Sequence, residues 1–188
     1  MPSAQAQGAL LLTHHTSAEA PQAGSSWLSR AIESALSIDA QPPIVVESIT
    51  ESMQKRLWWS ILLRDRSLCI GLRRRPQITS LNFRWYRGFL SEEDFEDEIA
   101  NSRVYDCTVK RMLIAVFQEQ CHLASLLTDL VVLVFSPRPT WYTAEAFHNA
   151  MSIIETIKSS LVMMERRFSN SVDDTCASIR NITLMYYQ

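Results

Sequence analysis

The sequence is poor in glycine and has no closely spaced cysteines, and both shortages restrict what the chain can be. Only four glycines and seven prolines occur in 188 residues, which leaves few of the turn signals that a β-sheet fold requires. The four cysteines, at positions 69, 107, 121 and 176, form no C-x-x-C pair and suggest no disulfide framework, a usage typical of a reducing compartment. These shortages predict a helical protein without a cysteine-rich metal site.

Long apolar runs and an excess of one charge are also missing. The longest apolar run, near Leu123 to Phe135, is interrupted by Asp129 and is too short to cross a bilayer, and the apolar segment 9–12 is too short for a signal peptide. A net charge of −2 gives no overall attraction to nucleic acid or to an anionic membrane. With 47% apolar residues, the chain is expected to form one globular domain over residues 1–188, with a loosely ordered N-terminus over residues 1–25.

Apolar residues recur at helical spacing through most of the chain. The pattern predicts helices near 26–38, 48–71, 92–101, 107–136 and 142–168, with a short apolar candidate at about 4–15. The apolar face of 107–136 is expected to hold Val109, Leu113, Val116, His122 or Leu123, Leu127, Leu130 and Val134, and that of 142–168 to hold Phe147, Met151, Ile154, Leu161, Met164 and Phe168. The fold class that follows is all-α, an irregular multi-helix bundle.

The most distinctive stretch runs from Lys55 to Ile78, KRLWWSILLRDRSLCIGLRRRPQI. Residues 48–51, Ser-Ile-Thr-Glu, have the spacing of a capping box, so we expect the helix to begin there. Gly71 suits a C-terminal cap and Pro76 prevents easy continuation of the helix. The spacing therefore predicts one long helix followed by a basic turn, with the helix and turn together covering 48–78.

Asp65 falls on the apolar side of this helix, where an unpaired carboxylate is costly. Partners available in sequence are Arg56, Arg64, Arg66 and the run Arg73, Arg74 and Arg75. One interpretation is a buried ion pair that joins the turn to the helix, and the other is a catalytic carboxylate. We favour the ion pair, because no second carboxylate, histidine or metal ligand lies nearby in sequence. We predict that an arginine of 73–75 pairs with Asp65 and that Trp58 packs beside that pair.

Other candidates for chemistry are weak. Cys121 and His122 are adjacent, so on a helix they diverge by about 100° and cannot act as nucleophile and base. From 55 to 87 there are nine basic residues and one acid, with Phe83, Trp85 and Tyr86 interleaved, whereas 92–98 holds six acids and no base. The basic stretch suits phosphate contacts, but we favour mutual neutralisation with the acidic run, which itself suits a helix start at Ser91. No catalytic, cofactor or metal residue is predicted.

The stretch 55–78 resembles the signature of the fungal-specific transcription factor domain, the middle homology region of zinc-cluster regulators. That signature has two basic residues, Leu-Trp-Trp, an aspartate, a small residue and Arg-Pro. Its structural residues correspond here to Trp58, Trp59, Asp65, Gly71, Arg74, Arg75 and Pro76, with Arg74 standing where many members have glycine. The segments LSEEDFEDEIANSRVYD at 90–106 and CHLASLLTD at 121–129 resemble the cutinase transcription factor branch of that family.

The resemblance implies a nuclear regulatory or effector region, serving a secondary-metabolite or carbon-utilisation gene set. Its partners would be the transcription machinery or a full-length relative, with a small-molecule effector between helices, indirect contact with DNA and none with membranes. The zinc of this family belongs to an N-terminal cluster of six cysteines that this sequence lacks, so we expect a partial domain without its own cofactor. A stand-alone helical interaction module that modulates a full-length regulator is the alternative, and an enzyme is a remote one.

Overall fold

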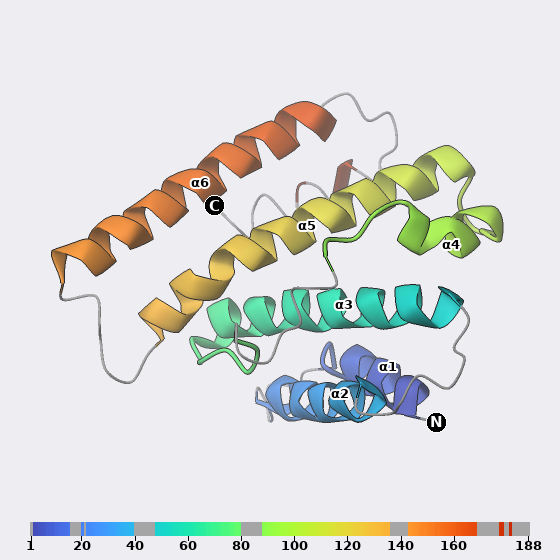
Figure 1. The fold of residues 1–188 in the computed structure, drawn as a ribbon, viewed down its shortest axis with the longest axis horizontal. Coiled ribbons are helices and arrows are strands. Elements are labelled where there is room, and N and C mark those ends of the chain that lie inside the picture. Colours follow the sequence, from blue (N-terminus) through green and yellow to red (C-terminus); the bar gives the residue numbers. More distant parts are fainter. Residues whose placement is uncertain are drawn as a thin grey trace. The chain divides into compact units, whose positions relative to one another are not determined.

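The computed structural model describes residues 2–15, 20, 22–39, 48–79, 88–135 and 143–168, together with 177, 178 and 181. Within these residues all regular structure is helical, which confirms the predicted all-α class (Figure 1). The chain divides into two compact units, Met1–Gly88 and Phe89–Gln188, and the expectation of one domain over 1–188 stays a prediction.

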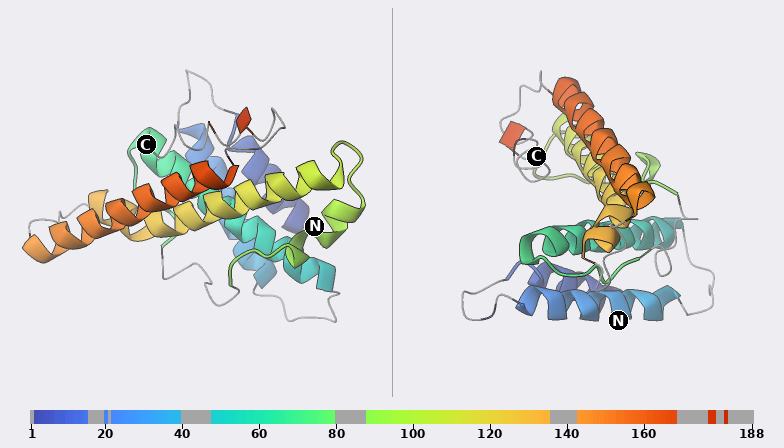
Figure 2. Two further views of the ribbon diagram at one scale, coloured as in Figure 1. Left: turned by 90° about the horizontal axis from the view of Figure 1, so that it is seen from above. Right: turned by 90° about the vertical axis from the view of Figure 1, so that its left-hand side faces the viewer.

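The first unit contains α1 (Pro2–Leu12), α2 (Ala23–Asp39) and α3 (Ser48–Leu72). Both α1 and α2 pack on α3 and on each other, so that α3 lies across the pair (Figures 1 and 2). The helix α3 has 25 residues and begins at Ser48, as predicted, although the side chains of 48–50 that would complete the capping box lie outside the described residues. Its buried apolar residues include Leu57, Ile61 and Leu62.

The short helix candidate at about 4–15 corresponds to α1, so the described residues of the N-terminus include a helix with a packed face where a loosely ordered segment was expected. Ala6 is 0% and Ala9 8% exposed, and both lie on one side of the helix, where small side chains let α1 approach its neighbours closely. Opposite them, an added Cβ on Gly24 of α2 would lie 2.9 Å from the carbonyl oxygen of Thr13. The sequence indicated the helix but not its packing, because a helix of this length is marginal alone and is stabilised by contacts that spacing does not reveal.

The second unit contains a 3₁₀ turn η2 (Glu93–Phe95), α4 (Glu96–Ala100), α5 (Cys107–Val134) and α6 (Ala144–Phe168). The long helices α5 and α6 run side by side as an antiparallel pair (Figures 1 and 2). The side chain of Asp106 caps α5 by accepting hydrogen bonds from the amides of Thr108 at 2.8 Å and Val109 at 2.9 Å. In place of the predicted helix at 92–101, the structure has η2, whose N-cap is Glu92 rather than Ser91, followed by the five-residue α4. The amide of Ser91 donates to Asp94 Oδ2 at 2.8 Å and so ties this turn to the preceding residue.

The predicted apolar faces of α5 and α6 are only partly correct. The buried residues of α5 are Ile114, Val116, Cys121, Leu123, Ala124, Leu127, Thr128 and Val131, and those of α6 are Ile157, Leu161, Met164 and Phe168. Val134 at the end of α5 is 54% exposed and Phe147 near the start of α6 is 60% exposed. Helical periodicity therefore identified the C-terminal half of α6, but its N-terminal half presents apolar side chains to solvent. The spacing alone does not say which turns of a helix meet a neighbour.

Candidate functional site

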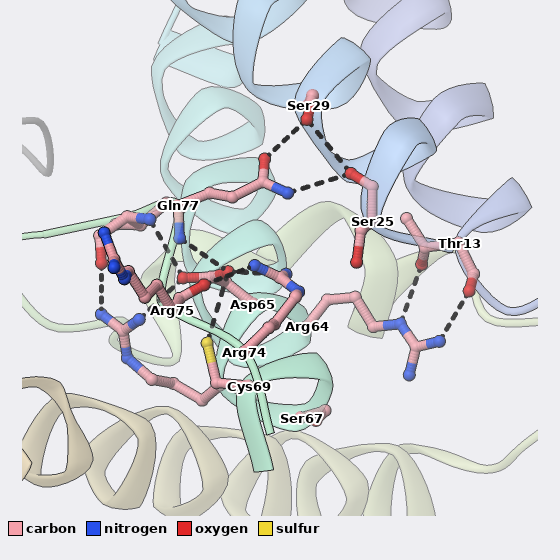
Figure 3. A network of polar contacts seen from close by, with 12 residues as sticks. Thr13, Ser25, Ser29, Arg64, Asp65, Ser67, Cys69, Arg74, Arg75 and Gln77 are labelled. Atoms are coloured by element: carbon pink, nitrogen blue, oxygen red, sulfur yellow. Dashed lines mark hydrogen bonds and ion pairs between the residues drawn. The ribbon is translucent and has the colours of Figure 1, made fainter. Parts of the chain in front are cut away.

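Two of the predicted signature residues, Asp65 and Arg74, meet at the buried carboxylate of Asp65, which is 0% exposed and lies in the fifth turn of α3. Arg66 Nη1 donates to Asp65 Oδ2 at 2.7 Å, and Arg74 Nη2 donates to Asp65 Oδ1 at 3.0 Å. The amides of Gln77 and Ile78 donate to the two carboxylate oxygens at 3.1 and 3.0 Å (Figure 3). We call Asp65, Arg66, Arg74, Gln77 and Ile78 the Asp65 cluster.

The predicted partner of Asp65 from the run 73–75 is Arg74, so that part of the ion-pair prediction is confirmed. The second charged partner is Arg66, whose guanidinium is 0% exposed and also donates from Nη2 to the carbonyl of Ile78 at 2.9 Å. Burial lowers the pKa of Arg66, while the negative charge of Asp65 acts in the opposite direction. Since an arginine does not lose its proton in proteins, the pair stays ionic.

The cluster joins the turn after α3 both to α3 and to α2. Asp65 receives the backbone of Gln77 and Ile78, and the side chain of Gln77 reaches α2, where its Nε2 donates to the carbonyl of Ser25 at 3.0 Å. Its Oε1 accepts a hydrogen bond from Ser29 Oγ at 2.8 Å (Figure 3). Gln77 was not singled out from sequence. The only sequence signal for its role was its position directly after Pro76. The turn at Pro76 reverses the chain, so the next residue can lie against α3.

Both tryptophans of the signature are buried and use their indole N–H groups in the first unit. Trp58 Nε1 donates to Asp39 Oδ2 at the end of α2, at 3.0 Å. Trp59 Nε1 donates to the carbonyl of Gly88 at 3.2 Å. Trp58 is 5% exposed, which agrees with its predicted place in the core, and its indole N–H is directed to α2. Its packing beside the Asp65 ion pair stays a prediction.

Gly71 does not cap α3 as expected. It is exposed within the last helical turn, and a Cβ added there would meet nothing within 4 Å. The left-handed position belongs to Arg73, with a φ of 50°. The amide of Arg73 donates to the carbonyl of Ile70 at 3.4 Å and that of Arg74 to Cys69 at 3.1 Å, the pattern of a Schellman motif with Arg73 at the position where glycine is preferred.

Arg64, another partner considered for Asp65, contacts α1 instead. Its Nε donates to Thr13 Oγ1 at 2.9 Å and its Nη2 to the carbonyl of Thr13 at 2.6 Å (Figure 3). Thr13 is 0% exposed, and its carbonyl belongs to the C-terminal end of α1, where a cation is favourable. Three consecutive residues of α3, from Arg64 to Arg66, therefore join the helix to α1 and to the turn that follows α3.

The arrangement around Asp65 suits a structural role better than a chemical one. The carboxylate accepts four hydrogen bonds from nitrogen donors and has no exposed surface, so a substrate cannot reach it. Nearby Cys69 is 0% exposed, and burial, assisted by the charge of Asp65, raises its pKa to about 12. A thiol with that pKa is protonated at neutral pH and is a poor nucleophile.

The acidic run 92–98 has its described ion pairs within the second unit. Glu98 pairs with Lys110 at 2.8 Å and Glu92 with Arg111 at 2.7 Å. We expected the run to be neutralised by the basic stretch 55–87, and these pairs show that α5 supplies two of its partners. The aromatic residues Phe83, Trp85 and Tyr86 of the basic stretch lie outside the described residues.

Two shallow hollows lie in the second unit. One of about 450 Å³ is lined by residues from Asp97 to Lys110, and one of about 380 Å³ is lined by residues that include Phe89, His122 and Arg167. The second hollow contains the ion pair between Arg167 and Glu119, at 2.6 Å. Cys121 beside it is buried, which raises the pKa of its thiol, so the pair Cys121 and His122 does not provide a nucleophile.

Two further features concern only the part of the chain that the structure describes. No group of three or more histidine, cysteine, aspartate or glutamate side chains there could hold a metal ion. No helix there is long and apolar enough to cross a membrane.

Comparison of the chain with known protein families, characterised proteins and solved structures finds no match. A function must therefore be argued from the geometry and from the signature residues.

Proposed function

We propose that this chain is the regulatory or effector region of a fungal transcription regulator and that it acts through protein contacts in the nucleus. The observation that supports the proposal is the Asp65 cluster. The residues by which the sequence resembles the middle homology region include the aspartate and the Arg74 that form this buried ion pair. A buried ion pair of this kind specifies how the turn meets the helix and offers no reactive group. The proposed role is therefore presentation of a helical surface, and no catalysis is assigned.

The proposal is tested by fusing the full chain to a DNA-binding module from an unrelated protein and measuring a reporter gene in a fungal cell. We expect the fusion to change reporter expression relative to the DNA-binding module alone. The variant Asp65→Asn should abolish the change, because it leaves Arg66 buried without its anionic partner. The matched control is Asp97→Asn, which removes the same charge from an exposed position of α4. An abundant, folded fusion that leaves the reporter unchanged would contradict the proposal.

A stand-alone interaction module that modulates a full-length regulator is the second candidate. The observation in its favour is the exposed apolar pair in the N-terminal half of α6, where Phe147 is 60% and Met151, one helical turn later, 40% exposed. In that case the tethered chain leaves the reporter unchanged, whereas the free chain alters the output of a full-length regulator expressed beside it. The two candidates therefore give opposite results in the tethered assay, and a small-molecule effector would appear as ligand-dependent output in either.

A further inference from the structure

The turn that follows α3 contains three arginines, Arg73, Arg74 and Arg75, which we call the arginine turn. Among the described residues, Arg73 is the one non-glycine residue with a positive φ. Glycine adopts this conformation without the clash that a Cβ creates, so an arginine at this position stabilises the fold less than glycine would. The chain has a glycine at position 71, where neither space nor backbone conformation requires one. Folding alone therefore does not account for the side chain at position 73, and an outlier of this kind points to a functional role for that side chain.

Hydrogen bonds of Arg74 and Gln77 fix the backbone of the arginine turn next to Arg73 and Arg75. Arg74 points inward, with Nη2 on Asp65 and with Nη1 donating to the carbonyl of Arg75 at 2.7 Å (Figure 3). Gln77 follows and is tied to α2 through Ser25 and Ser29. A backbone fixed in this way presents the side chains of Arg73 and Arg75 from defined positions, which lowers the entropy cost of binding.

Arg73 and Arg75 are both exposed, while the arginine between them is mostly buried. In the described part of the chain neither guanidinium pairs with an acidic side chain, and the nearest carboxylate in the turn, Asp65, is already occupied by four donors. The space over Gly71, in the last turn of α3, is open. Two cations at defined positions are therefore available to a partner without displacing an existing ion pair.

We infer that the arginine turn, through Arg73 and Arg75, binds an acidic peptide segment of a partner protein. A guanidinium forms a planar fork of donors that matches a carboxylate in bidentate geometry, so two arginines suit two carboxylates. Residues 1–88 contain ten arginines and lysines against six acidic residues, which favours an acidic partner for this unit. A nucleic acid is the weaker fit, because two cations neutralise only about two phosphates and DNA-binding proteins make roughly 6–10 such contacts.

The inference does not depend on what the chain regulates, and a direct binding measurement tests it. The probe is a short fluorescent peptide of alternating glutamate and glycine, with a peptide of alternating glutamine and glycine as the neutral control. Fluorescence anisotropy with the full chain should show salt-sensitive binding of the acidic peptide and none of the neutral one. The double variant Arg73→Gly with Arg75→Gln should lower affinity about fivefold, the effect of losing two exposed ion pairs of about 0.5 kcal/mol each.

The double variant keeps Arg74 and the Asp65 cluster and relieves the strained φ, so it should remain folded, which circular dichroism verifies. The charge-matched control carries Arg103→Gln and Lys158→Gln, two exposed positions of the second unit, and should keep the affinity of the original chain. An equal loss of affinity for the acidic peptide in the two double variants would show that binding depends only on net charge, and would overturn the inference. Tighter binding of a short duplex DNA than of the acidic peptide would also overturn it, because the occupant would then be a nucleic acid.

Discussion

At the scale of single residues, the chain stabilises one buried carboxylate with an unusually complete set of donors. Asp65 receives two guanidinium groups and two backbone amides, so none of its oxygens depends on water. A buried pair of this kind contributes little compared with an apolar replacement, but removal of one member leaves the other charge without a partner. Loss of Asp65 would therefore be costly mainly because the fully buried Arg66 would have no anionic partner.

The first prediction concerns Asp65→Asn. The substitution should lower the free energy of unfolding by about 3–5 kcal/mol, because Arg66 would remain buried without a counter-charge. Four of the five tryptophans lie in residues 1–88, so tryptophan fluorescence in a urea titration reports mainly on this unit. The control is Asp97→Asn, a substitution at an exposed position, which should leave the midpoint of the urea transition unchanged. An unshifted midpoint for Asp65→Asn would refute the structural role.

The second prediction concerns the left-handed position at 73. Arg73→Gly should be more stable than Arg73→Ala by about 1 kcal/mol, because both variants lose the same charge but only alanine keeps the Cβ that crowds a φ of 50°. At position 71 the order should reverse, with Gly71→Ala more stable than the original chain by up to about 0.5–1 kcal/mol, the helix-interior value, because Gly71 lies in the last turn of α3. Chemical denaturation measures both comparisons. If Gly71→Ala instead destabilised the chain, Gly71 would be the cap after all.

At the scale of elements, the first unit depends on the close approach of α1 and α2. Gly24 lies against the carbonyl of Thr13, and Arg64 of α3 binds that same carbonyl and the threonine hydroxyl. The helix α1 has few large apolar side chains, and a helix of 11 residues is marginal on its own. Its stability must therefore come from packing on α2 and α3, which includes this contact at the end of α1 as well as the buried face of Ala6 and Ala9.

The third prediction tests that contact with two glycines. Gly24→Ala should destabilise the chain by about 1–3 kcal/mol, because its Cβ would lie 2.9 Å from a backbone oxygen that cannot move without disturbing α1. Gly8→Ala, on α1 itself, has nothing within 4 Å of the new Cβ and should stabilise the helix by about 0.5–1 kcal/mol. Amide hydrogen exchange should show faster exchange in α1 for Gly24→Ala alone. Unchanged protection of α1 in that variant would mean that the contact does not hold the helix.

At the scale of the whole molecule, the charges of the two units differ in sign. Residues 1–88 have a basic excess, and residues 89–188 hold eight basic against 14 acidic residues. The net charge of −2 conceals this separation. Basic side chains on the first unit should attract phosphates weakly, whereas the chain as a whole has no cysteine cluster that could hold a DNA-reading zinc module.

The fourth prediction follows from that charge distribution. The purified chain should show no sequence-specific DNA binding at physiological salt, and any association should weaken steeply as salt rises, since phosphate contacts carry no sequence information. An electrophoretic mobility assay with random and competitor duplexes measures this. A footprint that survives competitor DNA and raised salt would make Arg73, Arg74 and Arg75 candidates for base readers and would contradict the proposed role.

The fifth prediction concerns the cysteines in both units. In a Cys176→Ser background, a thiol reagent should label exposed Cys107 in the native state and reach Cys69 and Cys121 only after unfolding. Because burial raises the pKa of Cys69 from 9.0 to about 12, the unfolded chain loses that proton first as pH rises. Stability should therefore fall between about pH 9 and pH 12, less steeply in Cys69→Ala. Mass spectrometry locates the label, and rapid native labelling of Cys69 would contradict its burial.

The sequence by itself determined the helical class, the position of α3 and the pairing of Asp65 with the arginine run. Helical periodicity, capping chemistry and the cost of an unpaired buried charge are local properties that residue spacing carries. Tertiary structure alone decided that Arg74 is the member of the run that pairs with Asp65, that Arg66 is the second partner and that Arg64 binds α1, because these choices depend on how the turn and α1 pack against α3. It also decided that Arg73 takes the left-handed position expected of a glycine cap and that α1 is a packed helix. Those outcomes depend on which surfaces meet at close range, and residue spacing within one helix does not contain that information.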